Sequence, residues 1–66
     1  MSLHLSLQSS HDALRECLSS LREAQRESEA IEDEGRSCVA PSGELERLVS
    51  QCQAMLRKLD QWQMRL

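Results

Sequence analysis

Apolar residues in the first half of the chain repeat every seven positions in two interleaved series, labelled a and d. The a series is Leu7, Leu14, Leu21 and Ser28, and the d series is Leu3, Ser10, Cys17, Ala24 and Ile31. Alternating steps of three and four place both series along one side of an α-helix, as in a coiled coil. The pattern therefore predicts a helix over about residues 3–33. Ala13 and Leu18 widen the stripe, which indicates that this helix faces more than one neighbour.

The start of this helix carries two competing patterns. Residues 3–7 alternate between apolar and polar, which by itself is typical of a strand. Ser9 and Asp12 have the spacing of a helix-capping pair. We expect a helix from about Ser10 that extends back toward Leu3, because the heptad pattern continues to that residue. Capping also explains His11 beside Ser9 and Asp12 better than a hydrolytic triad does, because neighbours at a helix start form no cleft.

The second half of the chain carries the same spacing without a miss. Its a and d positions are Leu45, Leu48, Cys52, Met55, Leu59, Trp62 and Leu66, and the flanking residues are Val49 and Leu56. Ser42, which lies between Pro41 and Gly43, is typical of a residue that caps a helix N-terminus. We therefore expect a second helix over about residues 42–66.

The two stripes do not belong to one continuous helix. The first a series would continue to residues 42 and 49, whereas the second falls at 45, 52 and 59, so the phase slips by three residues. The slip coincides with Gly35, Pro41 and Gly43, and inside a helix Pro costs roughly 3 kcal/mol and Gly about 1 kcal/mol. Gly35 suits the position just past a helix end. Residues 34–41 are long enough to reverse the chain.

The sequence thus predicts an all-α antiparallel helical hairpin with coiled-coil heptads, forming a single unit over residues 1–66. We expect it to place Leu21 and Ala24 near Leu56 or Leu59. Ordering the chain costs roughly 1.5 kcal/mol per residue, and burial of apolar surface stabilises it by about 25 cal/mol per Å². On this comparison a lone hairpin buries too little apolar surface to be stable. The apolar stripes are wider than one neighbouring helix covers. We therefore expect another helix or a second copy to complete a three- or four-helix bundle.

Composition and charge exclude several classes of function. The 66 residues include no Phe, no Tyr and one Trp, and a net charge of −3 does not suit a nucleic-acid-binding protein. No apolar run is long enough to span a membrane, and the first eight residues are too short and polar for a signal peptide. Three irregularly spaced cysteines are not a secreted disulfide framework. We expect an intracellular protein, located in the cytoplasm or associated with the nucleus or nuclear envelope.

Charge is distributed unevenly between the two predicted helices. Residues 12–34 contain three Arg against eight acidic residues, whereas residues 44–66 contain four basic residues against three acidic ones. A hairpin would therefore have an acidic loop end and a more basic open end. Two hairpins packed antiparallel would bring opposite charges together, which selects orientation more than it adds affinity.

The cysteines and histidines lack the spacing of a zinc site. His11 and Cys17 are six positions apart, and no C-x-x-C pair exists. Cys17 and Cys52 fall on the apolar stripes, where Cys acts as a small hydrophobe, so we expect both to be buried and reduced. Cys38 lies in the connector beside Arg36 and should be the thiol that reacts first. We expect no metal ion and no cofactor.

Residues 14–62 resemble the second and third helices of a spectrin repeat. The first of these helices ends in EAIEDEGR at residues 29–36, and the next opens with GELERL at residues 43–48 and carries Trp62. Spectrin repeats are three-helix left-handed coiled coils in actin crosslinkers, nuclear-envelope and junctional linkers and some exchange factors. The resemblance covers about three quarters of the chain and implies an incomplete repeat, because the family's first helix has no counterpart. Trp62 also lies about one heptad later than the family's third-helix Trp.

These patterns favour a protein-interaction or scaffold module that acts by coiled-coil packing, similar to part of a spectrin-like repeat of a cytoskeletal or multi-subunit assembly. The expected partner is a helical protein or a second copy, with an antiparallel dimer favoured, and not a nucleic acid, a membrane or a small-molecule substrate. The alternative is a small regulatory subunit or inhibitor that inserts one amphipathic helix into a partner's groove. We expect no enzyme, since two helices form no cleft. The expected partner-binding residues are Leu14, Leu18, Leu21, Leu45, Leu48, Val49, Met55, Leu56, Leu59, Trp62 and Leu66.

Overall fold

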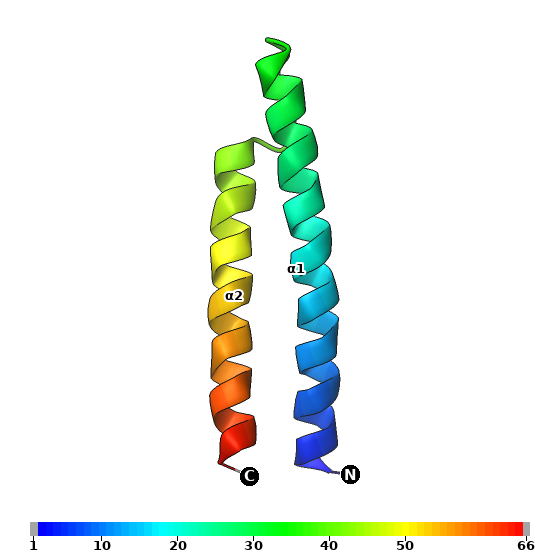
Figure 1. The fold of residues 1–66 in the computed structure, drawn as a ribbon, viewed down its shortest axis with the longest axis vertical. Coiled ribbons are helices and arrows are strands. Elements are labelled where there is room, and N and C mark those ends of the chain that lie inside the picture. Colours follow the sequence, from blue (N-terminus) through cyan, green and yellow to red (C-terminus); the bar gives the residue numbers. More distant parts are fainter. Residues whose placement is uncertain (1, 66) are drawn as a thin grey trace.

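A computed structural model describes residues 2–65 as two antiparallel helices joined by a connector (Figure 1). Helix α1 spans Leu3–Asp33 and helix α2 spans Ser42–Met64. The described residues contain no strand, so the predicted all-α helical hairpin is confirmed. The hairpin is a rod 49 Å long, with both chain ends at the same end of the rod (Figure 1). Of the two helices described, neither combines the length and apolar character needed to cross a bilayer.

The N-terminus of α1 lies earlier than the capping pattern at Ser9 predicts. Ser2 is the N-cap, and its hydroxyl accepts a hydrogen bond from the N–H of Leu5 at 3.4 Å. Ser9 lies inside the helix, so the predicted capping role of this segment is wrong. The heptad pattern, which continues to Leu3, locates the helix start better than the local polar cluster does.

The C-terminus of α1 is closed by Gly35, as the sequence predicts. Gly35 has a φ of 76°, a conformation that strains residues with a side chain. Its N–H donates to the carbonyl of Glu32 at 2.9 Å, and the N–H of Arg36 donates to the carbonyl of Ile31 at 3.3 Å. These paired hydrogen bonds form a Schellman motif and satisfy carbonyl groups that the helix end would otherwise leave free.

The connector folds back beside the last turns of α1. The hydroxyl of Ser28, which is only 3% exposed, donates to the carbonyl of Ala40 at 2.7 Å. Helix α2 therefore starts near the level of Ser28, and the end of α1 projects beyond it (Figure 1).

This fold-back changes the register of the hairpin. Leu59 lines one groove with Leu14, and Leu56 lines another with Leu18. The expected neighbours, Leu21 and Ala24, lie closer to the connector, by at least one turn for Leu56 and about two turns or more for Leu59. The difference arises because the connector runs back along α1 as far as Ser28 before α2 begins.

The N-terminus of α2 is capped by a side chain from α1. Pro41 occupies the N-cap position and makes no side-chain hydrogen bond, so the predicted N-cap role of Ser42 is wrong. Ser42 is the first helical residue, and its hydroxyl and N–H donate to the two carboxylate oxygens of Glu32 at 2.7 and 3.1 Å. These hydrogen bonds, chiefly the one from the hydroxyl, lower the pKa of Glu32 below its ordinary value of 4.5.

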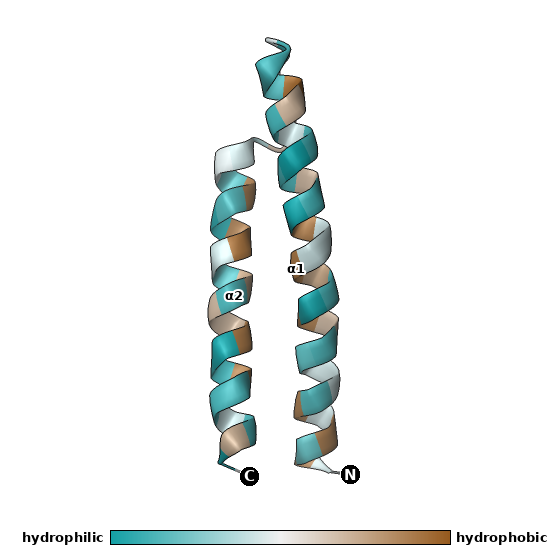
Figure 2. Cartoon of the chain, in the orientation of Figure 1, coloured by the Kyte–Doolittle hydropathy of each residue, from teal (hydrophilic) through white to brown (hydrophobic). Residues whose placement is uncertain are grey.

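The hydrophobic core is a thin line between the helices. Its buried apolar residues, all from α2, are Leu45, Val49, Cys52 and Leu59. Helix α1 adds the half-buried side chains of Leu7, Leu14, Leu18 and Leu21. Bands of hydrophobic residues recur along α2 on the side that faces α1 (Figure 2). No large side chain in residues 2–65 is less than 2% exposed, so this core is shallow throughout.

Candidate interaction surface

The contact between the helices uses only half of each predicted apolar stripe. On α2, the residues most covered by α1 are Leu45, Val49, Cys52, Leu56 and Leu59. These are the a positions and the positions four residues after them, which we label e. The partly buried a and e positions of α1 include Leu7, His11, Leu14, Leu18 and Leu21. The d positions of α2 and Cys17 of α1 are exposed beside this contact, whereas the d positions Ala24 and Ile31 of α1 are half-buried.

We define the apolar face by five of these d positions, Cys17 and Ala24 of α1 and Leu48, Met55 and Trp62 of α2. Leu48 is 46% exposed, Met55 49% and Trp62 48%. Their seven-residue spacing places them in a row along α2. The d residues of α1 are small by comparison, so the face is stepped, with a high side along α2 and a low side along α1.

An apolar groove lies on this face near the open end of the hairpin. It has a volume of about 210 Å³ and is lined by Leu14, Met55, Lys58, Leu59 and Trp62. The lining is almost entirely carbon, and Lys58 supplies the one charged group. In coiled coils, a side chain of one helix inserts between four residues of its neighbour. The groove is suited to accept such an apolar side chain.

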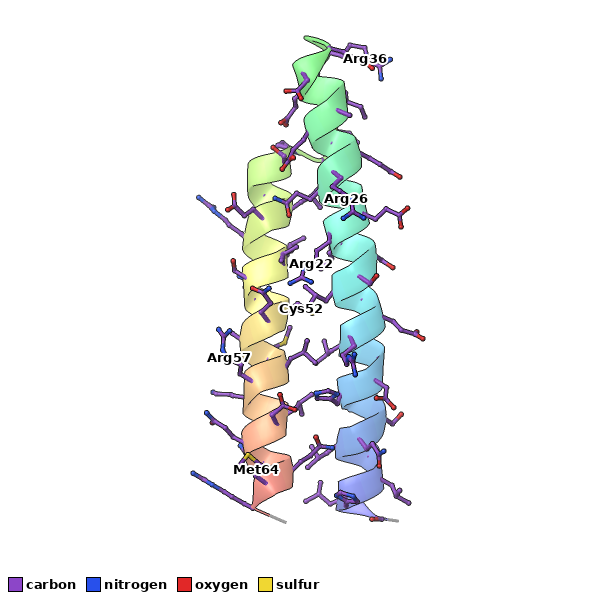
Figure 3. All side chains as sticks on the ribbon, viewed as in Figure 1. Arg22, Arg26, Arg36, Cys52, Arg57 and Met64 are labelled. Atoms are coloured by element: carbon purple, nitrogen blue, oxygen red, sulfur yellow. The ribbon has the colours of Figure 1, made fainter. Side chains whose placement is uncertain are left out.

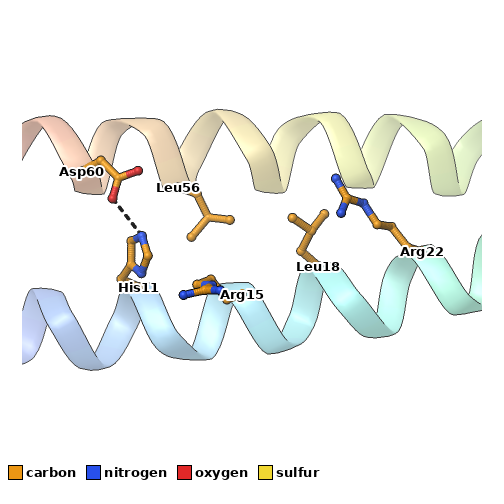
Figure 4. A pocket seen from close by; sticks show the side chains of 6 residues that line it. All are labelled: His11, Arg15, Leu18, Arg22, Leu56 and Asp60. Carbon is orange, nitrogen blue, oxygen red and sulfur yellow. Dashed lines mark ion pairs between the residues drawn. The ribbon is translucent and has the colours of Figure 1, made fainter.

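The opposite side of the hairpin combines charged residues with leucines. Figure 4 shows His11 of α1 facing Asp60 of α2, with Nε2 2.8 Å from Oδ1. The residues that line this side are His11, Arg15, Leu18, Arg22, Leu56 and Asp60. His11 therefore links the two helices, and its predicted role at a helix start is wrong. Because Asp60 is 57% exposed, the contact contributes little to stability.

The three cysteines have different surroundings. Cys52 is 2% exposed, and its thiol donates to the carbonyl of Leu14 at 3.4 Å. Burial, and to a smaller extent the neighbouring thiol of Cys17, raises the pKa of Cys52. Cys17 is exposed, so the prediction that it is buried is wrong. It occupies a d position, outside the helix contact. Cys38 is half-buried in the connector, and its thiol donates to the carbonyl of Ala40 at 3.3 Å.

The predicted partner-binding residues fall into three groups in the structure. Those buried within the hairpin are Leu45, Val49 and Leu59. Those partly buried along the helix contact are Leu14, Leu18, Leu21 and Leu56. Those exposed on the apolar face are Leu48, Met55 and Trp62. Leu66 lies outside the described residues. The surface open to a partner is therefore the third group, bordered by Leu14.

The sequence prediction omits Lys58, although its position offers a signal. Lys58 lies three residues after Met55 and four before Trp62, so all three share one side of α2.

Within residues 2–65, no group of three or more His, Cys, Asp or Glu side chains is placed to hold a metal ion. The chain matches no known protein family, no curated protein and no solved structure.

Proposed function

We propose that this chain is a protein–protein interaction module that binds another helix-containing chain by coiled-coil packing on its apolar face. The observation that carries the proposal is the row of half-exposed residues Leu48, Met55 and Trp62. Side chains of this size at heptad spacing are typical of a surface that another helix covers. The proposal is consistent with the resemblance to part of a spectrin repeat, in which a further helix completes the bundle.

The side of the hairpin that carries the apolar face is large enough for a stable interface. This side of the rod is 49 Å long and 16 Å wide, which is close to the roughly 800 Å² per partner of a standard interface, and the apolar face occupies about 21 Å of its length from Leu48 to Trp62. The exposed halves of its three large side chains amount to roughly 300 Å², or about 7 kcal/mol if fully covered at 25 cal/mol per Å². This gain also compensates for the thin core of the isolated hairpin.

The occupant that we propose for the apolar face is a second copy of this chain, packed with its loop end at the opposite end of the rod. The acidic residues near the loop are Glu29, Glu32, Asp33, Glu34, Glu44 and Glu46, and the basic residues toward the open end are Arg57, Lys58 and Arg65. Opposed packing would bring each acidic end to the partner's basic end. Such complementarity sets orientation and suppresses other pairings.

Sedimentation equilibrium over a range of micromolar concentrations tests this proposal. The wild-type chain of 7.5 kDa should form dimers, and Met55→Glu should be monomeric because it introduces a charge in the middle of the apolar face. Ala54→Glu is the matched control, since Ala54 is exposed and adjacent in sequence but is not part of the apolar face.

Three results would contradict the proposal in whole or in part. A wild-type chain that is fully helical and monomeric at every concentration would show that the hairpin needs no partner. Equal effects of Met55→Glu and Ala54→Glu would show that the apolar face is not the contact. A chain that is monomeric and poorly helical alone would reject the second copy as the occupant and point to a different helical protein.

A further inference from the structure

The buried thiol of Cys52 reaches the turn of α1 that carries Leu14 and Cys17. Cys52 extends from α2 toward α1 (Figure 3), and its Sγ lies 3.4 Å from the carbonyl oxygen of Leu14. Side chains on an α-helix lean toward its N-terminus, so the side chain of Cys17 covers the turn that contains Leu14. The two cysteines therefore adjoin the same turn of α1, and the nearby thiol of Cys17 is one of the groups that raise the pKa of Cys52.

We propose that Cys17 and Cys52 form an intramolecular disulfide that joins α1 to α2 when the chain meets an oxidant. Cys17 is exposed and Cys52 is buried, so reagents in solution reach Cys17 before Cys52. A disulfide across 35 positions of sequence restricts the unfolded chain strongly. Small domains with shallow cores commonly depend on such a link.

The chemistry balances with a small-molecule disulfide such as oxidised glutathione as the oxidant. The thiolate of Cys17 attacks one glutathione sulfur, which forms a mixed disulfide and releases one glutathione thiolate. The sulfur of Cys52 then attacks the sulfur of Cys17, which forms the protein disulfide and releases the second glutathione. The two protein thiols lose two electrons and two protons, and the two glutathione molecules gain them.

Cys38 is excluded from this pair by distance along the rod. Its thiol lies against Ala40, and Ala40 is held beside Ser28. Ser28 is eleven residues beyond Cys17 on α1, which corresponds to about 16 Å at 1.5 Å per residue. The Cα atoms of a disulfide must approach within about 7 Å, so Cys38 cannot replace Cys52 without unfolding of the loop end.

Tryptic mapping of the oxidised protein tests the pairing directly. Trypsin separates the three cysteines into residues 16–22, 37–47 and 48–57, one in each peptide. The full chain is incubated dilute with oxidised glutathione, and the band of monomer mass on a non-reducing gel is digested. The expected product is the peptide 16–22 linked to 48–57. A link to 37–47, or glutathione retained on Cys17 with Cys52 still free, would overturn the proposal.

A thermal measurement tests whether the link spans the folded hairpin. In a Cys38→Ser background, oxidation should raise the midpoint of helix melting by about 10 °C or more. The matched control is Cys17→Ser in the same background, in which the same treatment should produce no rise. An oxidised Cys38→Ser chain that melts at the same temperature as its reduced form, or below it, would show that the disulfide does not fit the native arrangement.

Discussion

Replacing Trp62 with Ala should weaken self-association at least a hundredfold. Trp62 is 48% exposed, and its covered half lies in the apolar groove with Leu14 and Leu59. The exposed half is available to a second copy. The substitution therefore removes both a contact inside the hairpin and a larger contact between copies, because each dimer contains two such residues.

The magnitude follows from the exposed area. A buried aromatic side chain removes 150–250 Å² from water, so the exposed half of Trp62 is about 100 Å². At 25 cal/mol per Å², covering it contributes about 2.5 kcal/mol per chain and about 5 kcal/mol per dimer. A tenfold change in affinity corresponds to about 1.4 kcal/mol, so even partial loss of this contribution raises the dissociation constant by two orders of magnitude.

The assay compares sedimentation equilibrium with helicity measured by circular dichroism at the same concentrations. Leu59→Ala is the contrasting variant: Leu59 is 7% exposed within the helix contact, and its truncation should cost about 2–5 kcal/mol and reduce helicity at every concentration. In the wild-type chain, Trp62 emission should move to longer wavelength on dilution. A Trp62→Ala chain with wild-type association, or wild-type emission that does not change on dilution, would refute the reasoning.

Two further predictions concern the loop end. Ser28→Ala removes the donor to the carbonyl of Ala40 and should lower the free energy of unfolding by about 1–2 kcal/mol in urea titrations. Ser20→Ala, at an exposed position, is the control and should not lower it. Equal losses in the two variants would contradict this prediction. The pKa of Glu32 is lowered in the folded state by its hydrogen bonds from Ser42, so its contribution to stability is complete above its unfolded pKa and is lost as pH falls through the folded value. The amide proton signal of Ser42 should accordingly titrate with a midpoint below 4.5 in the wild-type chain and lose this step in Glu32→Gln, and a midpoint at or above 4.5 would count against the assignment.

Local signals predict the break in the chain well, because they depend on a few adjacent residues. The register slip and Gly35 locate the end of α1, where the positive φ of Gly35 is needed. The cap on α2 could not be predicted in the same way, because Glu32 is ten positions away from Ser42. Only the fold-back of the connector brings these two residues together, and no local pattern encodes that path.

The heptad pattern identifies which residues are apolar but not which half of the stripe faces the other helix. In the middle of α1 the d positions Ser10, Cys17 and Ala24 are small, whereas the e position Leu18 is large. Packing through a and e leaves the larger d residues of α2, Leu48, Met55 and Trp62, exposed. The sequence reading treated Val49 and Leu56 as flanking residues, and the structure places them in the contact with α1.

Charge decides between the two ways in which such hairpins could stack face to face. With loop ends together, α2 of each copy would lie over α1 of the other, and large d residues would meet small ones. That arrangement would also bring the acidic tips together, including Glu29 and Asp33 of both copies, and like charges disfavour such a pairing. With loop ends opposed, each acidic tip meets the end that carries Arg57 and Arg65.

In the packing with loop ends opposed, α2 lies over α2, and Met55, near the middle of the helix, lies close to the twofold axis. A flexible thioether accommodates such a self-contact, whereas Met55→Glu would place two carboxylates there, so a single substitution perturbs the dimer twice.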